Sequence, residues 1–291
     1  MSTLKRRWKH RLEYVGYRLM SLIFGALPIE RAAALGAALV GWLGPKSRKR
    51  HPRMLRNIAT ALPELDEAER EILGVKVWRN LGYVLGEFFH LNELTRDRVE
   101  VENSELLESL AKSGKGVVFC GAHQANWEIA SVVLRDYGFK SMGVYHPMSN
   151  AYVDADVRAR RIDFYAGGLV SKHDPATPMA MLRHVRGGGA AAFLVDQQIH
   201  MGLMTPFFGR PAATTPFPAL AARQCDAPLV LLSGSRLPGS RFRMKAELIP
   251  TPRTDDRNAD ILAATTIVQA ELEKTIRQHP EQWMWTHDRW K

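Results

Sequence analysis

One stretch has the pattern of a buried strand, a tight turn and the start of a helix: Gly116-Val-Val-Phe-Cys-Gly-Ala-His-Gln-Ala-Asn-Trp-Glu128. Val117 to Cys120 form a continuous apolar run between glycines, which is typical of a strand buried on both faces of a parallel or mixed sheet. Small residues after the run allow a tight turn, and residues 126–134 then have the apolar spacing of a helix that packs on a sheet. His123 is therefore expected at the carboxyl end of a strand, where open α/β sheets place their ligands.

The spacing of His123 and Glu128 predicts a general base held by a carboxylate. On one continuous helix five residues rotate by about 140°, so the side chains can meet only if His123 precedes the helix and its ring folds back. Glu128 would then accept the Nδ1 proton and leave Nε2 free to take a proton from a substrate hydroxyl. The alternative is a histidine at a strand end beside an ordinary glutamate at a helix start, which the helix dipole favours.

Strands and helices alternate along the rest of the chain. Further strands are expected at residues 140–145, 190–195, 229–232 and 242–249, and helices at 64–92, 102–110, 152–165 and 259–278. With no internal repeat or linker after residue 60, this alternation predicts a single-domain, mixed-sheet α/β sandwich. The 190–195 strand runs into Asp196 and Gln197, so polar groups again follow a strand's carboxyl end.

Basic charge is concentrated at the start of the chain. Residues 1–60 contain thirteen Lys and Arg and only two acids, a net charge of +11, whereas the whole chain carries +10. The bases flank apolar runs at 19–29 and 32–44, each shorter than the roughly 20 residues of a spanning helix. This pattern favours an anionic membrane surface over nucleic acid. Residues 1–45 are expected to form a basic, apolar, membrane-associating helical segment, and residues 46–291 the catalytic domain. A solvated basic arm followed by a buried helix is the alternative.

Two further features concern the compartment. The N-terminal apolar stretch is interrupted and has no clear cleavage site, so we expect no cleavable signal peptide and a protein on the cytoplasmic side. Cys120 and Cys225 both lie in apolar surroundings. Two buried free thiols are therefore expected, in keeping with a reducing compartment.

Four segments share the pattern of one protein family. They are His123–Glu128, which is similar to that family's motif of a histidine, four residues and an acidic residue, together with Tyr145–Asn150, Asp196–Thr215 and Pro280–Lys291. In this order and spacing they resemble the lysophospholipid acyltransferase superfamily, and within it the lipid A biosynthesis acyltransferases of Gram-negative bacteria. The resemblance covers almost the whole chain.

The resemblance implies a glycerolipid acyltransferase-like fold and a defined reaction. A fatty acyl group would pass from an acyl carrier protein thioester to a hydroxyl of a lipid A precursor at the cytoplasmic face of the bacterial inner membrane, with no metal or other cofactor. A hydroxyl needs a base as it attacks, which suits His123 oriented by Glu128. The oxyanion of the tetrahedral intermediate would be met by backbone N–H groups after His123, or more weakly by Gln124 or Asn126.

The family pattern also suggests residues that bind substrate. Arg158 and Arg161 are expected to hold anionic sugar and phosphate groups of the acceptor, because their planar fork matches phosphate geometry; a solvated basic face of the helix is the alternative. Asp196 and Gln197 are expected to bind or position substrate, with a strand-to-loop cap as the alternative. His146 stands where many relatives have an arginine, so a weaker or titratable contact to the acceptor is one expectation, and a simple substitution on the rim of the substrate site is the alternative.

Other functions stay open at this point. A lysophospholipid or another glycolipid acyltransferase of the same superfamily would share these motifs, and a non-catalytic membrane-surface binding protein would share the basic start. A metal-dependent hydrolase lacks a convincing ligand set. Acyl chain length, the order of acylation and the choice between carrier-bound and coenzyme A donors do not follow from the sequence.

Overall fold

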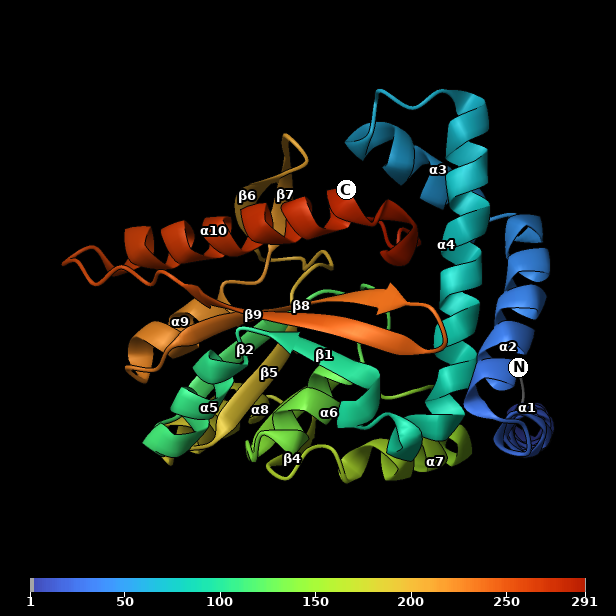
Figure 1. Cartoon of the computed structure of the whole chain (residues 1–291), viewed down its shortest axis with the longest axis horizontal. Coiled ribbons are helices and arrows are strands. Elements are labelled where there is room, and N and C mark those ends of the chain that lie inside the picture. Colours follow the sequence, from blue (N-terminus) through green and yellow to red (C-terminus); the bar gives the residue numbers. More distant parts are fainter. Residues whose placement is uncertain (1–2, 291) are drawn as a thin grey trace.

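A seven-stranded mixed sheet forms the centre of the molecule. In the computed structural model, which describes residues 3–290, its strands lie in the order β1-β9-β8-β2-β5-β3-β4 (Figure 1). β8 and β9 are antiparallel, and the other neighbouring strands are parallel. The strands are β1 (Val99–Glu102), β2 (Val117–Gly121), β3 (Ser141–Tyr145), β4 (Gly168–Ser171), β5 (Ala190–Leu194), β8 (Leu229–Leu237) and β9 (Arg241–Ile249). The predicted mixed α/β architecture is confirmed.

Helices cover both faces of this sheet. Val118 and Ala191 share a hydrophobic cluster with α8, α9 and α10, whereas Phe119 and Ala190 share a second cluster with α5 and α6. Because alternate residues of a strand point to opposite faces, β2 is buried at every position, as its apolar run predicted. These helices are α5 (Ser104–Ser113), α6 (Ile129–Asp136), α8 (Thr177–Arg186), α9 (Phe217–Gln224) and α10 (Arg257–Gln278).

The amino-terminal helices stand at one end of the sheet, where α1 packs beside α7 (Figure 1). They are α1 (Thr3–Gly25), α2 (Ile29–Leu43), α3 (Arg50–Ala61) and α4 (Glu67–Glu87), and α7 spans Ala151–Ile162. α2 and α4 touch through their backbones, because a Cβ added to Gly82 would lie 2.2 Å from the carbonyl oxygen of Gly36. α4 begins with a capping box, in which the side chains of Asp66 and Glu69 each accept a hydrogen bond from the other's backbone N–H.

Several elements differ from the sequence prediction. The helix expected at 126–134 begins only at Ile129, and the helix expected to reach residue 92 ends at Glu87 and continues as a 3₁₀ segment, Phe88–Glu93. Strands β1 and β4 and helices α3 and α8 were not predicted. Neither was a separate antiparallel hairpin, β6 (Leu203–Phe207) and β7 (Arg210–Thr214). Short 3₁₀ turns complete the chain at Gly44–Lys46, Arg96–Arg98 and Pro280–Gln282.

The expected membrane-associating segment corresponds to α1 and α2. Between residues 3 and 290, no helix combines the length and the apolar character that crossing a bilayer requires. The association of residues 1–45 with a membrane, and the division of the chain after residue 45, stay predictions.

Candidate active site

His123 and Asp196 meet because they follow adjacent parallel strands. Gly121 of β2 is paired in register with Leu194 of β5, and His123 and Asp196 each lie two positions further on. Nδ1 of His123 is 2.8 Å from Oδ1 of Asp196, and the backbone N–H of His123 donates to Oδ2 at 3.0 Å. A carboxylate only accepts, so Nδ1 carries the proton and Nε2 is left as the basic nitrogen.

Asp196 is a buried carboxylate with a third donor. The indole Nε1 of Trp283 donates to its Oδ2 at 2.8 Å. Burial alone would raise the pKa of Asp196, but the charge and hydrogen bonds of His123, together with the Trp283 bond, outweigh it and lower the pKa to about 2. Asp196 therefore stays ionised near neutral pH and can stabilise a positive charge on the His123 ring.

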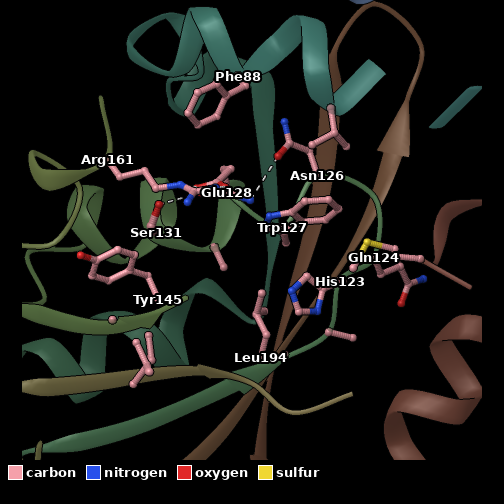
Figure 2. A pocket seen from close by; sticks show the side chains of 18 of the residues that line it. Phe88, His123, Gln124, Asn126, Trp127, Glu128, Ser131, Tyr145, Arg161 and Leu194 are labelled. Atoms are coloured by element: carbon pink, nitrogen blue, oxygen red, sulfur yellow. Dashed lines mark hydrogen bonds and ion pairs between the residues drawn. The ribbon is translucent and has the colours of Figure 1, made fainter. Parts of the chain in front are cut away.

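The predicted hydrogen bond between Glu128 and His123 is wrong. Glu128 is directed toward Arg161, with Trp127 between it and His123 (Figure 2), and it forms an ion pair with the Arg161 guanidinium in which Nε donates to Oε2 at 3.1 Å. The reason is local, because Ala125 adopts a left-handed backbone (φ 51°) that turns the chain before α6. A direct role of Glu128 in the chemistry stays a prediction.

The carboxyl-terminal segment fixes the turn that carries His123. The backbone N–H of Ala125 donates to the carbonyl oxygen of Gln282 at 2.8 Å, and that of Met284 donates to the carbonyl oxygen of His123 at 3.0 Å. Asn80 of α4 donates to the carbonyl oxygens of Ala125 and Gln282. The left-handed turn is therefore supported by two segments distant in sequence.

Two further polar side chains lie beside the His123 ring. Nε2 of Gln197 is 3.3 Å from Nε2 of His123 and 3.0 Å from Nε2 of His287. Burial lowers the pKa of His287, and the charge of His123 lowers it further. His287 was not predicted, although its segment was one of the four that carried the family resemblance.

A cavity of about 780 Å³ opens beside His123. It runs between the sheet and helices α6 and α7, and α1 and α4 complete its wall. Apolar side chains dominate the lining, among them Tyr17, Met20, Leu85, Phe88, Leu134 and Val157. An apolar cavity with a few convergent polar groups is the usual form of a small-molecule site.

The other predicted substrate-binding residues divide into two groups. Asn126, His146 and Arg161 line the cavity. Arg158 lies outside the lining, because it extends from α7 toward β4, over the Tyr145 ring and within 3.5 Å of the Leu169 carbonyl oxygen. His146 contacts His173, with Nδ1 and Nε2 separated by 3.1 Å, and its pKa is lowered by burial and by the charges of Lys172 and His173.

The side-chain amides suggested as oxyanion donors bond elsewhere. Nε2 of Gln124 donates to the Thr275 carbonyl oxygen at 3.1 Å, and Nδ2 of Asn126 donates to Oε2 of Glu87 at 2.9 Å. Both amides therefore brace the turn. The amide of Gln197, in contrast, lies beside Nε2 of His123.

Comparisons with known proteins cover all of these segments. The model of a family described as bacterial lipid A biosynthesis acyltransferase matches residues 5–291. The lipid A biosynthesis lauroyltransferase of Escherichia coli (strain K12) is 27% identical over 292 residues, which cover 96% of this chain and 91% of that protein. The myristoyltransferase of the same strain is 26% identical over 254 residues, covering 84% and 75%. Its palmitoleoyltransferase is 24% identical over 274 residues, covering 91% and 86%.

Proposed function

Because the chain belongs to the bacterial lipid A biosynthesis acyltransferases, we propose that the His123 cavity transfers a fatty acyl chain from an acyl carrier protein thioester to a hydroxyl of a lipid A precursor. Acyl transfer in lipid A biosynthesis, predicted from the sequence, is confirmed by the family and by the named relatives. The carrier-bound donor, the accepting hydroxyl and the residues that act on them are our proposal.

His123 acts as the general base. Its Nε2 takes the proton of the acceptor hydroxyl as that oxygen attacks the thioester carbonyl carbon, and Asp196 stabilises the imidazolium that forms. When the tetrahedral intermediate collapses, the carbon–sulfur bond breaks and the imidazolium returns the proton to the leaving thiolate. A positioned base of this kind contributes about 10²- to 10⁴-fold in rate. No acyl-enzyme is needed, and burial raises the pKa of the Cys120 thiol to about 12, which makes it a poor nucleophile.

Gln197 is the proposed donor to the oxyanion. Its amide nitrogen is close to both His123 and His287, two residues that line the cavity. A neutral His287 accepts from this amide and holds it in position, which agrees with the lowered pKa of His287. Losing one such donor typically costs about 10²- to 10³-fold in rate.

Arg161 supplies positive charge to the acceptor side of the cavity. Its ion pair with Glu128 fixes the guanidinium against the Phe88 ring, 5.3 Å from the ring centroid. An arginine held in this way still has N–H groups for an anionic group of the lipid. Glu128 is therefore proposed to position Arg161, in place of the role first predicted for it.

The outer face of α1 forms the membrane-binding surface. Trp8, Leu12, Val15, Leu19 and Leu22 recur every three or four residues and are all exposed. The inner face of the same helix carries Tyr17 and Met20 into the cavity lining. An exposed apolar stripe among basic residues suits an anionic leaflet, which supports a place at the cytoplasmic face of the inner membrane and an acceptor that enters from the lipid.

The observation that carries this proposal is the contact of His123 with buried Asp196 at the wall of an apolar cavity. Substituting His123→Ala should lower transfer from an acyl carrier protein thioester to purified lipid A precursor by at least about 10²-fold. Undiminished transfer would refute the catalytic assignment. A parallel assay with the coenzyme A ester tests the donor.

Mass spectrometry of lipid A from a deletion strain tests the substrate class. The loss of one acyl chain is expected. Unchanged lipid A with altered phospholipids would favour the lysophospholipid acyltransferase alternative, which shares the motifs of this chain.

A further inference from the structure

One row of residues across the sheet shapes the inner part of the cavity. Phe119 of β2 pairs with Ala192 of β5, Ala192 with Gly143 of β3, and Gly143 with Leu169 of β4, and all four line the cavity. Along this row the residues are therefore large, small, small and large. Gly143 leaves no free space, because a Cβ there would lie 2.4 Å from the ring of Tyr165. Ala192 is thus the position in the row where a small side chain leaves free space in the cavity.

The exposure of Ala192 shows that its side chain faces open space. β5 is a central strand, flanked by β2 and β3, and the neighbouring Ala191 points into the opposite core and is fully buried. Ala192 is only partly buried despite the same position in the sheet. Its small side chain therefore leaves room that a larger residue would occupy.

The opposite wall comes from α6. Ala130, Ser131 and Leu134 recur on one face of this helix and line the cavity. Leu134 lies six residues beyond Glu128, about 9 Å further along the helix axis, and is 1% exposed. Phe119 of the sheet also lines the cavity, belongs to the same hydrophobic cluster as Leu134, and is backed by the edge of Phe139, with ring centroids 4.9 Å apart. Leu134 is the last residue of α6 in the cavity lining.

We propose that Ala192 and Leu134 determine the length of the transferred acyl chain. This inference rests on the proposed function and adds the place of the chain, with its carbonyl at His123 and its methyl end between Leu134 and Phe119. An apolar pocket separates substrates that differ by one methylene by about 10- to 200-fold. A larger side chain at position 192 shortens the space for the acyl chain. A smaller side chain at position 134 lengthens it.

The experiment measures transfer rates with saturated acyl carrier protein thioesters of graded chain length. Ala192→Leu should move the preferred donor to a shorter chain, with a change of about tenfold or more in the ratio of the rates for the original and the shorter donor. Leu134→Ala should raise the relative rate of longer donors. Ala192→Val is a milder variant that tests the same direction if Ala192→Leu folds poorly, as judged by thermal melting.

Leu107→Ala is the matched control for Leu134→Ala. Leu107 is fully buried in the same hydrophobic cluster but lies outside the cavity lining. The Leu107→Ala enzyme therefore loses equivalent packing and should keep the original chain-length profile. A folded Ala192→Leu enzyme with an unaltered profile would overturn the proposal. An equal shift in Leu107→Ala and Leu134→Ala would overturn it as well.

A binding measurement separates this inference from the proposed function. Saturated fatty acids of graded length should raise the melting temperature of the wild-type protein most at one length, and Ala192→Leu should move that optimum to a shorter acid. If the wild type transferred no acyl group, the proposed function would fail while this shift could still be measured. Identical melting profiles for the two proteins would count against the chain-length role.

Discussion

At the scale of single residues, the site depends on a carboxylate that the chain keeps charged inside the protein. Asp196 is buried, yet it accepts hydrogen bonds from the ring and backbone of His123 and from Trp283. A buried charge is tolerated only when it is paired and hydrogen-bonded in this way. The same contacts that keep Asp196 ionised also hold His123 in the tautomer that exposes a basic nitrogen.

The low pKa of Asp196 predicts a specific loss of stability in acid. Its pKa of about 2 lies below the ordinary value of 3.8, so ionised Asp196 stabilises the fold above about pH 4. This contribution, about 2 kcal/mol, is lost as the pH falls from about 4 through about 2. Chemical unfolding of the wild type and of Asp196→Asn should therefore show a difference in unfolding free energy that shrinks by about this amount between pH 6 and pH 2.

That comparison removes the effect of the other acids, which titrate in both proteins. A difference that stays constant across this pH range would contradict the depressed pKa of Asp196.

The pairing of individual residues also marks the limit of sequence reasoning. His123 could be predicted, because a continuous apolar strand and a small-residue turn place it at a strand end. Its partner could not, because His123 and Asp196 are separated by 73 residues and meet only through the register of β2 with β5. Glu128 was close in sequence, but the left-handed turn at Ala125 directs it to another helix.

At the scale of elements, the least predictable pieces were short or contained proline. β1 and β4 each have four residues, and so few positions do not separate a strand from a turn by hydrophobic periodicity. In the hairpin, Pro206 faces Pro211 across the two strands, and proline within an apolar run argues against a strand. Phe207 and Phe208 of this hairpin pack against the closing tryptophans. Trp283 and Trp285 are themselves buried in the core.

The contact between α2 and α4 gives a prediction at this scale. Gly82→Ala would place a methyl group 2.2 Å from the Gly36 carbonyl oxygen and force the helices apart. Overpacking of this kind costs about 1–3 kcal/mol, which should appear in chemical unfolding.

Gly16→Ala in α1 is the matched control, since nothing lies within 4 Å of its added Cβ. In this exposed helix the same substitution should leave stability unchanged or raise it by up to about 1 kcal/mol. Equal effects of the two substitutions would contradict the close backbone contact.

At the scale of the whole molecule, charge and apolar surface are segregated. The net charge of residues 1–60 exceeds that of the full chain, and α1 exposes its apolar stripe within this segment. The same helix supplies Tyr17 and Met20 to the cavity. Our proposal assigns membrane binding and substrate entry to two faces of one helix, which the sequence indicated only as a basic, interrupted apolar stretch.

This segregation predicts salt-dependent binding to anionic vesicles. Binding should be stronger to vesicles containing phosphatidylglycerol than to phosphatidylcholine alone, and it should weaken as salt screens the basic residues. Leu12→Glu should reduce vesicle binding by more than about tenfold in a sedimentation assay, because it removes apolar surface and adds a negative charge.

Leu248→Glu is the control, since Leu248 is also exposed but lies on β9, away from α1. If both substitutions reduced binding equally, the α1 stripe would not be the membrane-binding surface.

The most direct measurement compares Asp196→Asn with Glu128→Gln in the transfer assay, as kcat and KM for the acceptor at several pH values. If Asp196 orients the His123 ring and stabilises its positive charge, Asp196→Asn should lower kcat by about 10³- to 10⁴-fold, as expected when the histidine loses its correct tautomer. Glu128→Gln, which loosens Arg161, should act mainly on KM for the acceptor. The opposite pattern, with kcat lost in Glu128→Gln and retained in Asp196→Asn, would contradict the assignment of Asp196 as the partner of His123.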